Sequence, residues 1–188
     1  MRAFVAVALP EAVRVALASL RDRLADSGAD VKWVGTEQLH ITLKFLADIT
    51  PEQQAAVEAL LRDLARHHLP FSMGLQEVGA FPSLVVPRVV WVGVGDGRAD
   101  LIRLAEAVES GVRGLGWPAE ERPFSAHVTL GRVRSPKRLG ALAETLRRTT
   151  WTPPPSWRAE VIRLYQSVLS PAGPTYAVLA EIPLRGER

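Results

Sequence analysis

The 188-residue sequence predicts an α+β protein made of two similar halves. Residues 39–43 (LHITL) recur as residues 126–130 (AHVTL), so that a His and a Thr stand two residues apart in both copies. Each copy lies in a half with the predicted order strand, helix, strand, helix, strand. The two motif histidines are 87 residues apart, and the strands that open the halves, near Phe4 and Val89, are 85 apart. Similar offsets at two landmarks indicate an internal duplication.

The first half alternates short apolar strands with two amphipathic helices. Its predicted strands cover residues 4–9, 31–34, 39–46 and 71–79. The first helix begins at Pro10-Glu11, carries apolar residues at helical spacing and is expected to end at Gly28. The second begins at residues 50–53 (TPEQ), a capping-box sequence with Pro at the first helical position, and is expected to end near His67-His68. Residues 81–83 (FPS) are expected to break the last strand.

The second half repeats this order. Its predicted strands cover residues 88–94, 122–133, 158–169 and 175–184. A helix is expected over residues 100–113, and another begins at Ser135-Pro136, as the earlier one does at Thr50-Pro51. Residues 152–155 (TPPP) form a stiff connection. By this repeat, residues 1–188 form a single domain of two intimately packed lobes, approximately 1–84 and 85–188.

Composition limits the classes of function. The chain has no Cys, which excludes disulfides and thiolate metal sites and is compatible with a cytoplasmic location. No apolar run approaches the roughly 20 residues of a membrane span, and the apolar opening is expected to be a strand. The net charge is +3 and the sequence pI is about 9.8, with Arg supplying nearly all of the positive charge. Arg suits phosphate recognition, but a genomic preference for Arg over Lys explains the bias equally well.

Each motif presents an imidazole and a hydroxyl on one face of a strand. Side chains at positions i and i+2 point the same way, so His40 lies beside Thr42. His127 and Thr129 repeat the arrangement. One such pair is more often two half-buried strand residues than a site, but two pairs placed alike in similar halves favour a function. An approximate two-fold axis would bring the motif strands face to face across a cleft.

Two histidines on opposite sides of a substrate can act as base and acid in one displacement, because neutral imidazole accepts a proton and imidazolium donates one. Phosphodiester cleavage needs such a pair, and the Thr hydroxyls would donate hydrogen bonds to the non-bridging phosphate oxygens. The scheme requires no metal and no cofactor. A metal site lacks a third ligand, since no His-x-His or His-Glu-x-x-His sequence occurs. His67-His68 is expected to complement a helix dipole.

The sequence resembles the 2H phosphoesterase superfamily in its two motifs, its duplicated layout and its length. Within the superfamily it is most similar to the bacterial and archaeal RNA 2′,3′-cyclic phosphodiesterases, historically called 2′-5′ RNA ligases. The segments that carry the resemblance are residues 4–7 (FVAV), 33–34 (WV), 39–46 (LHITLKFL), 90–94 (VWVGV), 124–132 (FSAHVTLGR) and 173–176 (GPTY). Two positions depart from the family pattern: Ala126 stands where Pro is frequent, and Ala47 where Gly is common. The second departure is expected to alter the turn after the first motif strand.

The resemblance implies a bilobal fold with a pseudo-two-fold duplication. Each lobe would be an antiparallel-rich sheet with two helices outside, and the active cleft would lie between the lobes. The implied activity is the metal-independent opening of a terminal 2′,3′-cyclic phosphate on an RNA end to a 2′-phosphate. The implied catalytic residues are His40, Thr42, His127 and Thr129, with His127 as the base and His40 as the acid. We expect a cytoplasmic monomer whose partners are RNA ends.

Family members also use an aromatic residue and an Arg beyond the motifs, which match Phe45 and Arg132, each five residues after its His. Phe45 would stack on a base, and Arg132 would hold phosphate or base. Strict alternation turns both away from the imidazoles, so a bulge, a strong twist or the strand's end is required; otherwise Phe45 is a core residue and Arg132 a solvated one. Lys44, four residues after His40, shares its face in a regular strand and is expected to contact phosphate instead. Trp33, near the first motif, is expected to line the cleft.

Two other functions stay open. One is an RNA-end binding or ligating module with little hydrolysis, because ring opening and the joining of a cyclic phosphate to a 5′-hydroxyl share one transition-state geometry. The other is a 2H enzyme that acts on a small non-RNA cyclic phosphate. A long Arg-lined groove beyond the phosphate would favour RNA, and a closed pocket would favour a small molecule.

Overall fold

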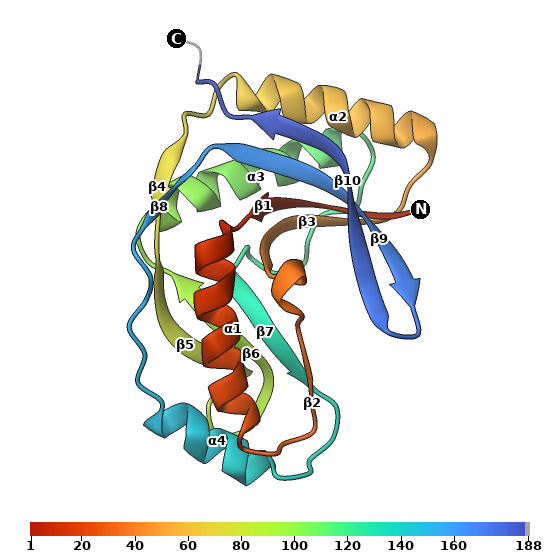
Figure 1. Cartoon of the computed structure of the whole chain (residues 1–188). Coiled ribbons are helices and arrows are strands. Elements are labelled where there is room, and N and C mark those ends of the chain that lie inside the picture. Colours follow the sequence, from red (N-terminus) through yellow and green to blue (C-terminus); the bar gives the residue numbers. More distant parts are fainter. Residues whose placement is uncertain (187–188) are drawn as a thin grey trace.

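The computed structural model describes residues 1–186, which form ten strands, four α-helices and one 3₁₀ turn (Figure 1). The strands are β1 (Arg2–Ala8), β2 (Val31–Trp33), β3 (His40–Asp48), β4 (Phe71–Met73), β5 (Leu75–Pro82), β6 (Pro87–Val94), β7 (His127–Val133), β8 (Trp157–Ala159), β9 (Val161–Ser170) and β10 (Gly173–Pro183). The helices are α1 (Glu11–Ala25), α2 (Pro51–Ala65), α3 (Arg98–Gly114) and α4 (Leu139–Arg148), and the 3₁₀ turn is η1 (Thr36–Gln38). No helix within residues 1–186 is long and apolar enough to cross a membrane.

Two four-stranded sheets form the two lobes. The first sheet has the order β10-β9-β1-β3, the second has the order β2-β7-β6-β5, and all their strand pairs are antiparallel. Helices α2 and α3 pack against the first sheet, and α1 and α4 pack against the second (Figure 1). β4 and β8 form a separate two-stranded ladder. The predicted bilobal α+β class, with two helices outside each antiparallel sheet, is confirmed.

The sheets do not follow the two halves of the sequence. The first sheet combines β1 and β3 with β9 and β10 from the end of the chain. The second combines β2 and β5 with β6 and β7. Each lobe therefore takes two strands from either half, and the boundary near residue 84 divides the sequence repeat but does not divide the sheets.

Helix starts show where local sequence decided the structure and where it did not. The capping box of α2 is confirmed: the Gln53 amide donates to Thr50 Oγ1 (3.2 Å) and the Thr50 amide donates to Gln53 Oε1 (2.9 Å). The predicted start at Ser135-Pro136 is wrong, since α4 begins at Leu139. Arg138 has a left-handed backbone (φ 55°), and its Nε donates to the distant Ser27 carbonyl (2.9 Å). A left-handed residue cannot continue a right-handed helix, so the helix begins after it.

Three predicted strands also change their bounds. The strand expected over residues 122–133 begins only at His127. The strand expected over residues 71–79 divides into β4 and β5, and β5 runs through Phe81-Pro82, which was expected to break it. The strand expected over residues 158–169 divides into β8 and β9. In both divided strands the first piece leaves the main sheet to form the β4–β8 ladder, a pairing between distant segments.

Candidate active site

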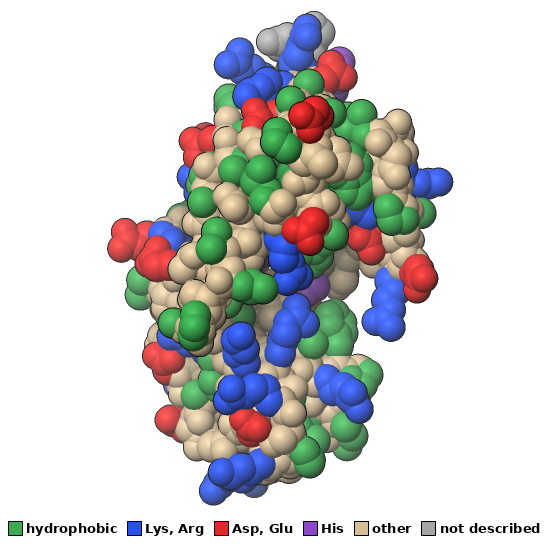
Figure 2. Space-filling view, turned by 90° about the vertical axis from the view of Figure 1, so that its right-hand side faces the viewer, with side chains coloured by type: hydrophobic (Ala, Val, Ile, Leu, Met, Phe, Trp, Pro, Cys, Tyr) green, Lys and Arg blue, Asp and Glu red, His purple; other side chains and the backbone are tan. Residues whose placement is uncertain are grey.

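The two motif strands lie where the lobes meet. His40 is the first residue of β3 and His127 is the first residue of β7, and these two strands are in contact. Figure 2 shows a His side chain at the bottom of a hollow near the middle of the molecule, with Lys and Arg side chains above and below it. The predicted alternation is present in both copies. The His and Thr are half-buried, and the apolar residues between and after them are buried.

Both imidazoles are held by the same local contact. Nδ1–H of His40 donates to the Gln38 carbonyl oxygen at 2.6 Å, and Nδ1–H of His127 donates to the Ser125 carbonyl oxygen at 2.8 Å. A carbonyl only accepts, so Nδ1 carries the proton in both rings, and Nε2 of each neutral ring is a proton acceptor. At His40 this acceptor is used: the Thr42 hydroxyl donates to Nε2 at 2.8 Å.

Aromatic rings surround both imidazoles. The centroid of Phe4 lies 4.9 Å from that of His40, and Tyr176 meets the same imidazole edge-on at 5.3 Å. Phe81 meets His127 edge-on at 5.4 Å. This packing restricts ring rotation and reduces hydration, which favours neutral imidazole.

Burial lowers the pKa of both histidines below the usual value, against the opposing effect of the backbone carbonyl that each ring contacts. The positive charge of Arg132 lowers the pKa of His127 further. Before substrate binds, the neutral form of each ring is therefore favoured at neutral pH. A phosphate anion between the rings would raise both pKa values by charge attraction.

A β-bulge in each motif strand decides which later residues share the histidine face. Ala6 pairs with Thr42 while its neighbour Val5 pairs with Lys44, so β3 carries one extra residue. Likewise, Trp91 pairs with Thr129 while Val90 pairs with Gly131. Each extra residue reverses the alternation, so the residue five positions after the His returns to the histidine face.

The bulges bring Phe45 and Arg132 to the histidine face. Phe45 is 60% exposed, and its ring lies 6.0 Å from Phe4, which contacts His40. Arg132 is exposed and lies near enough to His127 and Tyr176 to affect the pKa of both. The bulge that both residues need in order to reach the histidine face is therefore present. The roles of Phe45 and Arg132 in binding stay predictions.

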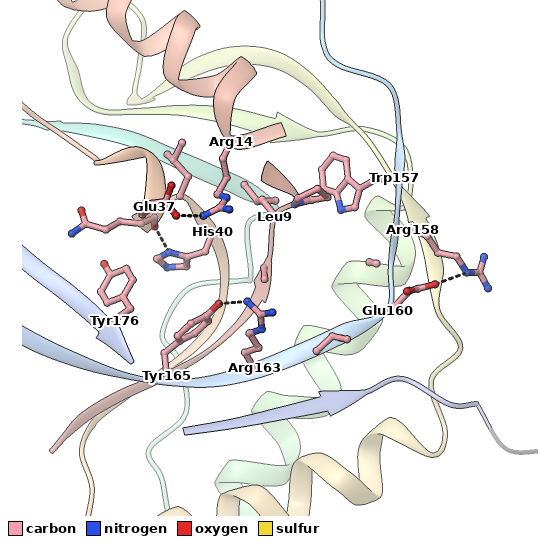
Figure 3. A pocket seen from close by; sticks show the side chains of 16 residues that line it. Leu9, Arg14, Glu37, His40, Trp157, Arg158, Glu160, Arg163, Tyr165 and Tyr176 are labelled. Atoms are coloured by element: carbon pink, nitrogen blue, oxygen red, sulfur yellow. Dashed lines mark hydrogen bonds and ion pairs between the residues drawn. The ribbon is translucent and has the colours of Figure 1, made fainter. Parts of the chain in front are cut away.

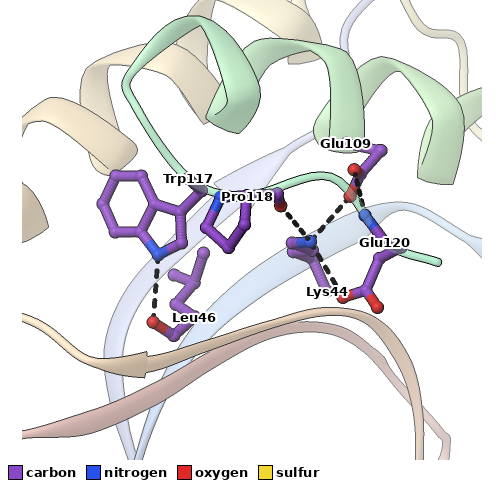
Figure 4. Close-up of polar contacts among 6 residues, drawn as sticks. All are labelled: Lys44, Leu46, Glu109, Trp117, Pro118 and Glu120. Carbon is purple, nitrogen blue, oxygen red and sulfur yellow. Dashed lines mark hydrogen bonds and ion pairs between the residues drawn. The ribbon is translucent and has the colours of Figure 1, made fainter.

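The prediction that Lys44 contacts phosphate is wrong. The bulge turns Lys44 to the opposite face, where it is only 4% exposed. Its ammonium lies 2.8 Å from carboxylate oxygens of both Glu109 and Glu120 and also contacts the Pro118 carbonyl (Figure 4). Burial disfavours the charged ammonium, but the two carboxylates outweigh it and raise the pKa of Lys44. Lys44 therefore ties β3 to α3 and to the segment that leads into β7.

The prediction that Trp33 lines the cleft is also wrong. Trp33 pairs with Gly131, and a Cβ on Gly131 would lie 2.7 Å from Trp33 Cε3 and from Val31 Cγ1. The indole therefore packs beside buried Val31, on the core face of the second sheet. Sequence reasoning missed Lys32, which is exposed and pairs with Arg132 on the opposite face. The alternation of residues 31–33 was the available signal, because Trp33 and Lys32 cannot share a face.

The site is built from side chains that transfer protons and donate hydrogen bonds. Nε2 of each imidazole can accept or donate a proton according to its charge, and the Thr hydroxyls can donate to an oxyanion. Within residues 1–186, no three His, Asp or Glu side chains gather as ligands for a metal ion.

Comparison with known proteins places the chain in a family. The family model described as "LigT like Phosphoesterase" matches twice in succession, at residues 7–91 and 92–176. An Aeropyrum pernix protein named RNA 2′,3′-cyclic phosphodiesterase is 37% identical over 166 residues, which cover 88% of this chain and 93% of that protein. A crystal structure of a Thermus thermophilus protein has a TM-score of 0.83 at 34% identity and full coverage of both chains. That of E. coli LigT in complex with 3′-AMP has a TM-score of 0.77 at 26% identity, covering 97% of each.

Proposed function

The chain belongs to the LigT-like family of 2H phosphoesterases, and from this premise we propose that it is an RNA 2′,3′-cyclic phosphodiesterase. It hydrolyses a terminal 2′,3′-cyclic phosphate to a 2′-phosphate with two histidines as acid and base. The A. pernix relative's name supports the reaction. The observation that carries the mechanism is that both imidazoles donate Nδ1–H to a carbonyl two residues earlier, which leaves both Nε2 atoms for proton transfer.

In the proposed reaction, water attacks the phosphorus atom and the P–O3′ bond breaks. His127 Nε2 removes the proton of the attacking water, and protonated His40 Nε2 gives its proton to the departing O3′. The hydroxyls of Thr42 and Thr129 donate to the non-bridging oxygens. Without substrate, the Thr42 hydroxyl donates its hydrogen bond to His40 Nε2. When the phosphate binds, this hydroxyl donates to a phosphate oxygen instead and leaves Nε2 for proton transfer.

One histidine must be protonated and the other neutral for this reaction. Burial favours the neutral form of both rings, so the substrate itself, an anion, promotes uptake of the one proton that is needed. Two imidazoles and two hydroxyls then supply every proton transfer and oxyanion contact, which is why we propose metal-independent catalysis. His40 and His127 come from different sheets of one chain, so we further propose that residues 1–188 act as one catalytic domain and as a monomer.

The residues on the histidine face support RNA as the substrate. Phe45 offers an exposed ring on which the terminal base stacks, and Arg132 offers a cation beside His127. Lys32, paired with Arg132, adds a second cation on that face. Aromatic surface and cations together suit a nucleotide.

The deciding experiment uses an RNA oligonucleotide that ends in a 2′,3′-cyclic phosphate, incubated with the protein in excess EDTA. We expect clean conversion to a 2′-phosphate end, and loss of conversion in His40→Ala. A 3′-phosphate product would show that O2′ leaves and would contradict the direction of cleavage. Loss of activity in EDTA with recovery on adding a divalent cation would contradict metal independence.

The same groups, acting in the same roles, could join two RNA ends. A 5′-hydroxyl in place of water would attack the cyclic phosphate, His127 would take its proton, and the product would carry a 2′-5′ linkage. We propose this as a minor activity, because water is far more concentrated than any RNA end. Adding a 5′-hydroxyl oligonucleotide to the assay tests it: a longer, joined product is expected only at high acceptor concentration.

A further inference from the structure

A cavity of about 420 Å³ opens on the first sheet beside His40 (Figure 3). Six residues that border it come from α1, η1 and β3 on one side and from β8 and β9 on the other: Arg14, Glu37, His40, Trp157, Arg163 and Tyr165. Its volume falls within the range of small-molecule sites. Figure 3 shows Arg14 reaching in from α1, opposite Tyr165 and Arg163, with Trp157 towards the β8 end.

A small residue borders the cavity on the strand next to β3. Ala8 on β1 pairs with His40 and lines the cavity. In the second sheet, Trp91 pairs with Thr129, and its ring lies 6.4 Å from that of His127. The indole covers Gly79, where a Cβ would be 2.3 Å from Trp91 Cη2.

Two buried donors at the cavity have no partner. Arg14 Nε and Trp157 Nε1 are buried side-chain donors without a hydrogen bond to any of the described residues, and both belong to residues that border the cavity. Buried donors without an acceptor are unfavourable and uncommon in native proteins. An oxygen-rich group in the cavity would supply the acceptors after a small rotation of either side chain.

The other groups of the cavity suit a nucleotide. Arg14 Nη1 donates to Glu37 (2.6 Å), and Arg163 donates to Glu181 (2.7 Å) and to the Tyr165 hydroxyl (3.3 Å). A guanidinium has five N–H groups, so both Arg keep donors for phosphate or ribose oxygens. The rings of Tyr165 and Trp157 provide surface on which a base can stack.

The order of the substituents on ribose determines which part of the substrate points to the cavity. The cavity lies beyond His40 at the start of β3, whereas Phe45 lies farther along the same strand, on the other side of Thr42. In a nucleoside 2′,3′-cyclic phosphate the base is attached next to C2′, and the 5′ carbon is attached next to C3′. A terminal base stacked on Phe45 therefore directs the 5′ oxygen towards the cavity. It also places O3′ at the His40 end, where the proposed mechanism needs a proton donor.

We propose that this cavity, which we call the upstream pocket, binds the phosphate and nucleoside immediately 5′ of the terminal nucleotide. The enzyme then selects the ends of RNA chains over free 2′,3′-cyclic mononucleotides. The inference rests on the proposed function, because it uses a cyclic phosphate held between His40 and His127.

The test compares three substrates that share one terminal nucleoside: adenosine 2′,3′-cyclic phosphate, the same compound with a 5′-phosphate, and a dinucleotide that ends in it. The quantity measured is kcat/KM. We expect the dinucleotide to exceed the mononucleotide by at least about 10-fold, with the 5′-phosphate compound between them. Trp157→Phe, which removes only the indole N–H and part of the ring, and Arg14→Met should each reduce this ratio by about 3- to 10-fold.

Matched controls are Trp151→Phe and Arg62→Met. The Trp151 indole donates to Gln76, and Arg62 forms a surface pair with Glu58; neither residue borders the cavity. Both controls should keep the wild-type ratio. Equal turnover of the three substrates would overturn the upstream pocket and leave the proposed function standing, as would a ratio that neither pocket variant changes. Failure to open any of the three would overturn the proposed function, and the inference with it.

Discussion

The two His-x-Thr strands have the same backbone but different surroundings. In both, the imidazole donates to the carbonyl two residues earlier, and a bulge follows the Thr. The residue four positions after the His faces the core: it is Lys44, clamped by two carboxylates, in one strand and Gly131, covered by Trp33, in the other. Duplication preserved the geometry that aims the imidazoles, and divergence of the neighbours gave each histidine its own environment.

The neighbours also differ on the histidine face. Beside His40 lies a cavity that Ala8 borders, whereas the indole of Trp91 lies 6.4 Å from the ring of His127 and covers Gly79. The exposed residue five positions after the histidine is aromatic in one strand, Phe45, and cationic in the other, Arg132. A symmetric pair of proton carriers thus lies in an asymmetric site, which is what a reaction with one acid and one base requires.

Removal of either imidazole should have the largest effect. We expect His40→Ala and His127→Ala each to lower kcat for a cyclic-phosphate RNA by about 10²- to 10⁴-fold. The double variant should lose less than the product of the two factors, because the pair acts as a unit. Single variants that fold normally, as judged by circular dichroism, and retain near-normal rates would exclude the mechanism.

The core-facing residues Lys44 and Gly131 give a second comparison, which is measured as the free energy of unfolding. Lys44→Met leaves two carboxylates without their cation and should lower the free energy of unfolding by about 1–3 kcal/mol. This is less than for a fully buried pair, because Glu109 and Glu120 are 24% and 54% exposed. Gly131→Ala should cost about 1–3 kcal/mol for a different reason, overpacking against Trp33.

Urea unfolding measures both stability losses, and exposed Lys137→Met serves as the matched control. Adding Glu109→Gln should restore part of the stability of Lys44→Met, since it removes one uncompensated charge, but it should not help Gly131→Ala. If Lys44→Met were no less stable than Lys137→Met, the buried ion pairs would contribute nothing.

The pH dependence distinguishes the two histidines. Burial lowers the pKa of both, and Arg132 lowers that of His127 further, so Arg132→Met should raise the pKa of His127 towards its usual value and leave that of His40 nearly unchanged. A base with a higher pKa is lost to protonation at higher pH. The acid limb of kcat/KM should therefore move to higher pH in this variant. NMR titration of the two imidazoles checks that the pKa of His127 is the one that moves, and a shift of the basic limb in place of the acid limb would reverse the acid and the base.

The smallest expected effect concerns a strand irregularity that β7 does not share. Ala47 has a left-handed backbone (φ 57°) at a second bulge of β3, where Leu46 is the extra residue. Ala in this conformation is strained by about 1 kcal/mol, so Ala47→Gly should raise the free energy of unfolding by up to that amount. Thermal unfolding measures the change, with Gly in place of Ala55, inside α2, as a control that should destabilise. A destabilised Ala47→Gly would show that the strain is not relieved.

Short-range pattern was enough to predict much of this protein. The repeated His-x-Thr pairs, the alternation around them and the capping box of α2 are local signals, and the structure follows them because strand alternation and helix capping involve only neighbouring residues. The same alternation showed that Phe45 and Arg132 needed a bulge to reach the imidazoles. It did not indicate that a bulge was present.

Tertiary structure decided what depends on distant pairing. The bulge in β3 arises from its register against β1, and it sent Lys44 to the core, where carboxylates from α3 and the following segment receive it. Pairing between β2 and β7 placed Trp33 over Gly131. Pairing between β9 and β1 mixed the two sequence halves in one sheet and opened the cavity beside His40. Register between strands far apart in the chain is set by the packing of the whole molecule, and a one-residue shift in it reverses the face of every residue that follows.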